Sequence, residues 1–256
     1  LKIRGLDKAA IDEKVKECAK RAGITAILYE RAGKASLIDR KRLALARLFL
    51  RDCKAVLVDD ITRGLDKEEA TTLWREAAPV LVEKAREGKS VIFATRDKDE
   101  ALSVADRIAV LHYREVKQIG TYEDIMQNPS NVWAVQAFDE DYHFEKATLD
   151  VKNGALVCKT CDGYTIDVTH LDGKIADEYI GKTVLAGWRS DSYDVRGERK
   201  IAVDYALKRQ DGYILVCGDT RVKSKEKSNE VGTLPLANTA RLFDDTNENS
   251  IVKGNL

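Results

Sequence analysis

Two carboxylates stand side by side just after a short apolar run in the first quarter of the chain. Asp59 and Asp60 directly follow residues 55–58, Ala-Val-Leu-Val. A continuous apolar run of this length is typical of a parallel strand covered on both faces. Open α/β sheets bind ligands at the carboxyl ends of such strands. The pair therefore indicates a ligand site, although two solvated acids at a strand end would give the same pattern.

The sequence on both sides of Asp59 and Asp60 predicts the elements that position this pair. Asp39 is followed by an amphipathic apolar series, so we expect a helix that begins at Asp39 as its N-cap. The helix leads through a short turn into the strand 55–58. An acidic turn ending in Asp66 follows the strand, and Glu69 three residues later completes a capping-box pattern for the next helix.

The order and spacing of the whole segment 36–66 resemble the nucleotide-binding subunit of ABC transporters. In that family a signature helix precedes the Walker B strand, a paired acid and a short D-loop ending in Leu-Asp. The resemblance places Asp59 on the Walker B aspartate, Asp60 on the catalytic glutamate and Asp66 at the end of the D-loop. Residues Ser36 to Asp39 fall on the Ser-Gly-Gly-Gln of the signature.

The resemblance implies ATP and Mg²⁺ as cofactors, sandwiched between two subunits, with Asp59 holding the metal through water. It also implies that Ser36, Asp39 and Asp66 contact the nucleotide. Asp60 would position the attacking water on an arm one methylene shorter than glutamate. General-base work depends on hydrogen-bond reach, and a misplacement of about 1 Å could reduce the rate roughly a hundredfold.

Several positions depart from the family pattern. Leu37 and Ile38 occupy the two signature glycines, which let a phosphate approach the helix N-terminus closely. Asp39 replaces the glutamine and adds negative charge. Arg96 occupies the position of the switch histidine; an arginine can bind a phosphate oxygen but does not titrate near neutral pH. We therefore expect degenerate chemistry with little or no ATPase activity in this chain alone.

No phosphate-binding P-loop is expected in the sequence. The segments 88–90 and 181–183 contain the Gly-Lys-Ser/Thr core, but Glu83 and Ala176 stand where the first glycine is required. Each segment also precedes a strand, whereas a P-loop follows one and opens a helix. The Walker A loop and the Q-loop of the family lie upstream of the matched segment, so we expect this chain to lack both.

The remaining elements of the first half follow from periodicity and caps. We expect helices at 7–22 and at 67 to about 86, a buried strand at 90–95 and a hairpin over 107–120. Pro79 should kink or split the second helix. Trp74 belongs to the apolar stripe of that helix and is expected in the core.

The pattern of apolar, polar and turn residues changes near residue 140. Short alternating runs separated by Asn-Gly and Asp-Gly pairs predict a small all-β barrel over 141–256. Segments 181–195 and 237–252 resemble the oligonucleotide-binding-fold, TOBE-type domain of carbohydrate importer ATPases of the maltose and glycerol-phosphate kind. The expected architecture is thus an α/β fold, the C-terminal part of an ABC-type ATPase core over 1–140, followed by this barrel.

The five cysteines are scattered and odd in number, which favours a reduced, cytoplasmic chain. Cys158 and Cys161 form one C-x-x-C pair, which is half of a zinc site. Cys217 and His170 could complete it only if the barrel brings them together. We expect no metal there.

The amino-acid composition limits the classes of partner that we expect this chain to bind. Basic and acidic residues both number 43, so the net charge is zero and nothing indicates a nucleic-acid footprint. The N-terminal residues lack signal-peptide character, and no apolar run is long enough to span a membrane. The resemblance implies a cytoplasmic protein on the inner face of the cell membrane, with permease subunits and a second ATPase subunit as partners. The alternatives are a non-catalytic regulatory subunit and a fragment of a longer enzyme.

Overall fold

The computed structural model describes residues 5–51, 53–139, 142–189, 199–209, 212–217, 220–232 and 239–252. The chain divides into two compact units, residues 1–106 and residues 107–256. Within the described ranges, no helix combines the length and the apolar character needed to cross a membrane.

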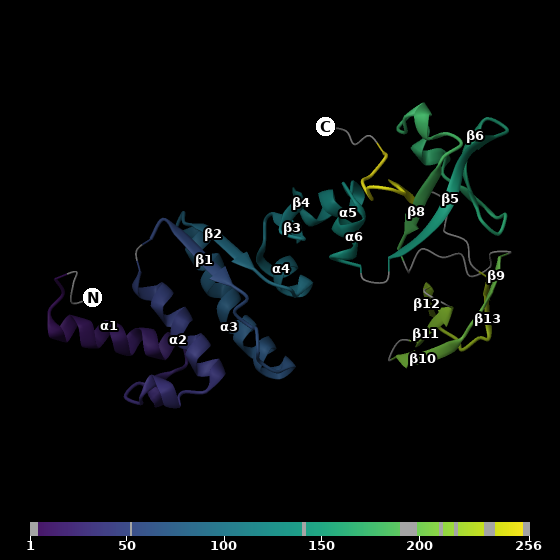
Figure 1. Ribbon diagram of the computed structural model, residues 1–256. Helices are drawn as coiled ribbons and strands as arrows, with labels where there is room; N and C mark the ends of the chain where they lie inside the picture. Colours follow the sequence, from purple (N-terminus) through teal and green to yellow (C-terminus); the bar gives the residue numbers. More distant parts are fainter. Residues whose placement is uncertain are drawn as a thin grey trace. The chain divides into compact units, whose positions relative to one another are not determined.

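The first unit is an α/β arrangement (Figure 1). Its elements, in chain order, are α1 (Lys8–Arg21), η2 (Thr25–Ile27), η3 (Ala32–Lys34), α2 (Leu37–Leu50), β1 (Ala55–Asp59), α3 (Lys67–Arg86), β2 (Ser90–Ala94) and α4 (Lys98–Val104). β1 and β2 pair in parallel, with Ala55 opposite Ser90 and Asp59 opposite Ala94. Helix α3 is the crossover between them, as parallel strands require.

The β1–β2 pair is covered on one face only. Helices α2 and α3 lie on the same side of the strands in Figure 1, and Leu45 of α2 and Leu73 of α3 share a cluster with Val58. On the opposite face, Leu57 is 73% exposed and Ile92 is 63% exposed. The prediction that these strands are buried on both faces is therefore wrong for the described chain, because no described residue covers that second face.

Helix boundaries follow their caps. Asp7 caps α1 by accepting from the amide of Ala10 at 2.8 Å, as expected. The predicted cap of α2 is wrong: Ser36 is the N-cap and Asp39 lies three residues inside, where its amide donates to the Ser36 hydroxyl. Pro79 was predicted to kink or split its helix; the split is not found, since α3 continues through Pro79 from Lys67 to Arg86.

The second unit contains a hairpin, two short helices and a β-rich part. Its elements are β3 (Ile108–His112), β4 (Glu115–Gly120), α5 (Tyr122–Gln127), α6 (Val132–Gln136), β5 (His143–Lys152), β6 (Ala155–Thr160), β7 (Thr165–Asp167), η4 (Thr169–Leu171), η5 (Asp177–Tyr179), β8 (Thr183–Trp188), β9 (Lys200–Ala202), β10 (Tyr205–Arg209), β11 (Gly212–Cys217), β12 (Thr220–Ser224), β13 (Glu230–Gly232) and β14 (Arg241–Asp244).

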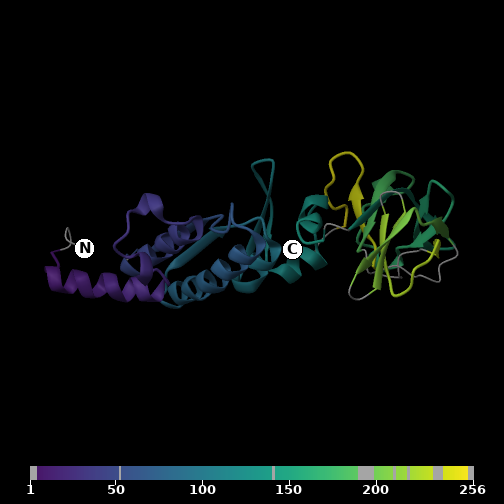
Figure 2. The same cartoon turned by 90° about the horizontal axis from the view of Figure 1, so that it is seen from below.

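The strands from β5 onward form three sheets, ordered β14-β8-β5-β6-β7, β10-β11-β12 and β13-β9. The β10–β12 sheet lies beside the five-stranded sheet in both views (Figures 1 and 2). One hydrophobic core joins them and includes Leu149, Trp188, Leu215 and Leu242. The described residues do not form a closed barrel, so the predicted barrel is not found, and the TOBE-type assignment stays a prediction. Parts of the two segments that resemble that domain, residues 190–195 and 237–238, lie outside the described residues.

Contacts also tie α6 to the last strand region. The amide of Val132 donates to the carbonyl of Glu248 at 3.0 Å. Val135 and Phe243 are both fully buried in one cluster with Tyr142. The residues on either side of position 140 therefore pack together within the second unit. A domain boundary at 140 stays a prediction.

Candidate functional site

The candidate site lies in the first unit, at the carboxyl end of β1. Asp59 is the last residue of the strand and its side chain is exposed. Among the described residues, none forms a hydrogen bond or an ion pair with the Asp59 carboxylate. The carboxyl end of a parallel strand is the ordinary ligand position of such sheets, so the oxygens of Asp59 are available to a ligand.

Asp60 is held in an unusual backbone conformation. Its φ is +42°, in the left-handed region that aspartate tolerates better than most residues. The Asp60 amide donates to the carbonyl of Ala94 at 2.8 Å, which extends the β1–β2 ladder by one bond. This bond fixes the chain where it leaves the strand.

Two cations lie next to Asp60. The Nε of Arg96 is 3.8 Å from Asp60 Oδ2, and the Nζ of Lys41 is 3.5 Å from the Asp60 carbonyl oxygen. Arg96 is 82% exposed, so its ion pair contributes little to stability. The structure thus brings together Asp60 and Arg96, the two residues predicted to be catalytic, and adds Lys41, which the sequence reasoning did not single out.

The N-terminus of α2 carries its own negative charge. The Ser36 hydroxyl donates to Asp39 Oδ2 at 2.6 Å and accepts from the Asp39 amide at 3.2 Å. Arg42 donates to Asp39 Oδ1 at 3.4 Å. Helix N-termini attract anions through free amides and the helix dipole. Here the Asp39 amide is already hydrogen-bonded to Ser36, and the Asp39 carboxylate offsets the positive end of the helix dipole.

Arg42 is a second residue that sequence reasoning missed. Its guanidinium donates to both carboxylate oxygens of Glu76, at 2.8 and 2.6 Å. The Glu76 hydrogen bond is the main cause that raises the pKa of Arg42, and burial opposes it. This bidentate pair joins α2 to α3. The one available signal was the position of Arg42 within the helix that precedes the strand.

The loop between β1 and α3 is shaped by Gly64 and Asp66. Gly64 has a φ of +85°, and a Cβ there would lie 3.4 Å from Leu37 Cδ2. The loop and the start of α2 are therefore neighbours. Asp66 Oδ1 accepts from the amide of Glu69 at 2.8 Å and caps α3, as expected. That capping role gives Asp66 a structural function whether or not it contacts a nucleotide.

The residues present fit a metal ion better than a phosphate. Mg²⁺ binds proteins through one or two carboxylates and keeps several waters, and the exposed Asp59 offers such a ligand. A phosphate at α2 would meet the Asp39 carboxylate, and the Asp39 amide there is already hydrogen-bonded to Ser36. Leu37, which is 38% exposed, also stands at that helix start. The α2 N-terminus therefore does not fit a phosphate group.

The C-x-x-C pair does not assemble a metal site. Cys158 is fully buried in the core, and burial raises its pKa to about 12. Cys161 is exposed, with its sulfur 3.8 Å from the carbonyl oxygen of Lys146. His170 instead places Nε2 at 3.0 Å from the Ala240 carbonyl oxygen. Across the ranges that the structure describes, no group of three or more metal-ligating side chains is found.

The chain is similar in sequence to ATP-binding proteins of transporters. The chain is 30% identical over 203 residues to the multiple sugar-binding transport ATP-binding protein MsmK of Streptococcus mutans, covering 75% of this chain and 52% of MsmK. It is 27% identical over 248 residues to the sn-glycerol-3-phosphate import ATP-binding protein UgpC of Jannaschia, covering 95% of this chain and 69% of UgpC. Its homologues are ABC transporter ATP-binding proteins.

The homologues do not all serve sugars. A spermidine/putrescine import ATP-binding protein, PotA of Fusobacterium nucleatum, is 25% identical over 256 residues, covering 98% of this chain and 66% of PotA. The chain spans about half the length of MsmK and about two thirds of UgpC and PotA. No family model matches the chain.

Proposed function

We propose that this chain is the ATP-binding subunit, or part of the ATP-binding subunit, of an ABC importer for carbohydrates, with little or no ATPase activity by itself. The observation that carries the proposal is the match of 75% or more of the chain to importer ATP-binding proteins, two of them named for sugar or glycerol phosphate transport. In this role the chain works on the inner face of the membrane, with permease subunits and a second ATPase subunit.

The geometry at β1 supports a retained metal-binding role with altered turnover. Asp59 presents a free carboxylate for Mg²⁺ at the strand end. Asp60, the proposed water-positioning acid, is instead engaged with Arg96 at 3.8 Å. The α2 N-terminus, the proposed partner of the γ-phosphate, carries the Asp39 carboxylate. These features favour nucleotide contacts that are weak in this chain alone.

The test is phosphate release and nucleotide binding by the purified 256-residue chain. We expect no Mg²⁺-dependent ATP hydrolysis above buffer and no saturable binding of a fluorescent ATP analogue at micromolar concentrations. An intact relative such as MsmK, assayed in parallel, provides the positive control. Hydrolysis by the isolated chain that disappears in Asp59→Asn would overturn the claim of low activity and leave the family assignment standing.

A second candidate is a non-catalytic regulatory subunit that pairs with an active ATPase subunit and docks on a permease. The Ser36–Asp39 arrangement favours it, because the Asp39 carboxylate at this helix start repels a phosphate from a partner. Co-purification of the tagged chain with an intact ATP-binding subunit and permease from its source cells would support it. The intact mass of the polypeptide in those cells discriminates further: a mass near 28.6 kDa favours the regulatory subunit, and a larger one a longer enzyme.

A further inference from the structure

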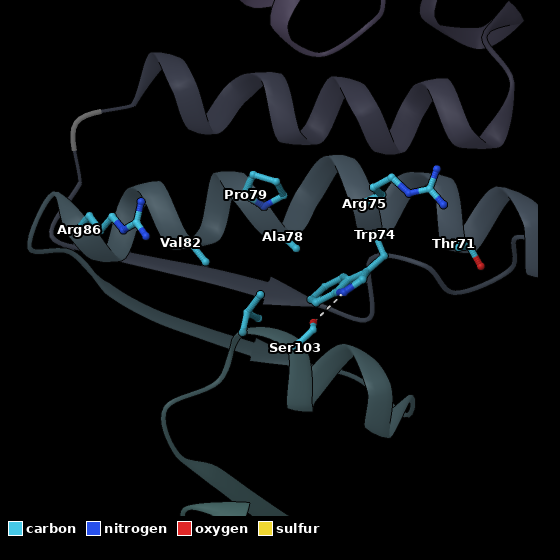
Figure 3. A pocket seen from close by; sticks show the side chains of 9 residues that line it. Thr71, Trp74, Arg75, Ala78, Pro79, Val82, Arg86 and Ser103 are labelled. Carbon is cyan, nitrogen blue, oxygen red and sulfur yellow. Dashed lines mark hydrogen bonds between the residues drawn. The ribbon is translucent and has the colours of Figure 1, made fainter.

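A shallow groove of about 560 Å³ runs along the outer face of α3 in the first unit. Its floor is apolar and is formed by Trp74, Pro79 and Val82 of α3 and by Val104 at the end of α4. Figure 3 shows Val82 and Trp74 on the lower side of α3, with Trp74 reaching toward α4, and Pro79 on the upper side of the helix. The groove lies on the part of α3 that faces away from its buried residues Leu73, Ala77, Val80 and Leu81.

Contacts within the first unit hold the Trp74 side chain of the groove in place. The indole Nε1 of Trp74 donates to Ser103 Oγ at 3.0 Å, and the Ser103 hydroxyl donates to the Glu100 carbonyl at 2.7 Å. The Trp74 ring also packs on Phe93, with centroids 5.6 Å apart. Trp74 is half-buried, not part of the fully buried stripe that its spacing predicted. A ring held by these two contacts offers its exposed part to a partner at low entropic cost.

Two arginines, Arg75 and Arg86, flank the apolar floor at opposite ends (Figure 3). Arg86 follows Arg75 by eleven residues, which returns to the same helix face within about 20° and separates the two by about 16 Å along the axis. Within the part of the chain that the structure describes, neither guanidinium has an ion-pair or hydrogen-bond partner.

The three charged residues between Arg75 and Arg86 are already paired on the other side of α3. Glu76 binds Arg42, Glu83 binds Arg21, and Lys84 binds Glu87. Each acid of α3 between Arg75 and Arg86 thus binds another cation, whereas Glu68 and Glu69 lie on the first turn of the helix, before Arg75. Arginine is always charged and pairs with carboxylates in a fixed fork. Charge complementarity thus selects an anionic partner with an apolar middle.

We propose that this groove docks an amphipathic helical segment of a partner protein, with acidic residues about eleven positions apart and leucine-like side chains between them. The apolar side chains lie over Trp74 and Val82, and the two carboxylates bind Arg75 and Arg86. An apolar helix face laid into a groove is a recurring mode of peptide recognition. The candidate nucleotide site and this groove use different residues, so the docking does not depend on ATP.

The proposal is tested with a fluorescein-labelled synthetic helix of this pattern: two glutamates about eleven residues apart and leucines between them on one face. Its binding to the full chain is followed by fluorescence anisotropy and by the part of the tryptophan emission that is absent in Trp74→Phe. We expect saturable binding that weakens with salt and that falls roughly tenfold when glutamine replaces both glutamates. Two exposed ion pairs together contribute roughly tenfold in affinity.

Charge reversal supplies the decisive comparison. Arg75→Glu/Arg86→Glu should weaken the glutamate peptide by at least roughly tenfold and should gain affinity for a matched peptide with lysines in place of the glutamates. The rescue by the lysine peptide separates lost docking from lost folding. Lys8→Glu/Lys16→Glu on α1 changes the net charge equally and should leave both peptides unaffected.

Three outcomes would overturn the proposal: equal binding by the charge-reversed variant, equal binding of the glutamine peptide, or no saturable binding of the glutamate peptide. Binding to vesicles of phosphatidylserine without binding to the peptide would also overturn it, because the two arginines would then serve a membrane surface.

Discussion

At the scale of single residues, Asp60 links the fold to the candidate chemistry. Its φ of +42° puts it in a region where a short polar side chain is tolerated and a β-branched one is strained. Glutamate, the acid that the resemblance expects at this position, lacks the local hydrogen bonding that favours aspartate there. The backbone at the strand exit therefore favours the shorter acid, at the expense of reach.

This conformation predicts an ordered series of stabilities. Asp60→Val should lower the free energy of unfolding by about 1–2 kcal/mol, because valine in the left-handed region is strained. Asp60→Asn should stay within about 0.5 kcal/mol of the wild type. Urea unfolding followed by circular dichroism measures both. Equal stability of the valine and asparagine variants would contradict the strained backbone.

A partly buried ion cluster in the second unit predicts a pH dependence of stability. Arg199 donates to both oxygens of Glu145 at 2.7 and 2.9 Å and pairs with Asp162 at 2.7 Å. Burial raises the pKa of Glu145, but the hydrogen bonds and charges of His143 and Arg199 outweigh burial and lower the pKa to about 2. A carboxyl with a depressed folded pKa stabilises the fold above its unfolded pKa of about 4.5.

The stabilisation should therefore be lost as the pH falls from about 4.5 toward 2. In the wild type, the urea midpoint of the second unit should fall over this window. In Glu145→Gln the midpoint should be lower at neutral pH and change less on acidification. Exposed Glu178 gives the matched control, since Glu178→Gln should reproduce the wild-type profile. Parallel curves for wild type and Glu145→Gln would exclude this cluster as the cause.

The residue scale also shows the limit of reading sites from sequence. Asp59, Asp60 and Asp66 lie where the apolar run and the capping pattern place them, because both signals are local. The proximity of Lys41 to Asp60 and of Arg42 to Glu76 was not predictable. These contacts depend on how α2 packs against the strand and against α3, and no local pattern encodes that packing.

At the scale of elements, local signals predicted the helices and turns but not which faces of the strands are covered. The Asn153-Gly154 pair, with φ values of +53° and +80°, turns β5 into β6 as expected for a hairpin. The apolar run of β1 predicted a strand, yet Leu57 and Ile92 are exposed. An apolar run indicates that both faces suit burial, whereas actual burial depends on which segments lie against the sheet.

Truncating side chains on the two faces of β1 should reduce the stability of the fold to different extents. Val56 is 2% exposed, so Val56→Ala should cost about 2 kcal/mol through lost burial and a residual cavity. Leu57 is 73% exposed, and Leu57→Ala should change stability by less than about 0.5 kcal/mol. Chemical denaturation of the two variants makes the comparison. A large cost at Leu57 would mean that this face is covered in solution.

At the scale of the whole molecule, the described hydrophobic clusters each fall within one unit. The clusters built on Ala19 and on Leu73 lie in residues 1–106, and the large cluster built on Trp188 lies in residues 107–256. The first unit has small clusters and an exposed sheet face, while the second has a core that joins three sheets. Chains with separate cores commonly depart from two-state unfolding.

We therefore expect two thermal transitions, the first from residues 1–106. Because less apolar surface is buried in the first unit, its transition should occur at the lower temperature. Trp74 reports on the first unit, and Trp133 and Trp188 report on the second. Calorimetry should resolve both steps, and in Trp74→Phe the fluorescence change of the first step should disappear while the second persists. A single transition that coincides in calorimetry, fluorescence and circular dichroism would show that the two cores unfold as one.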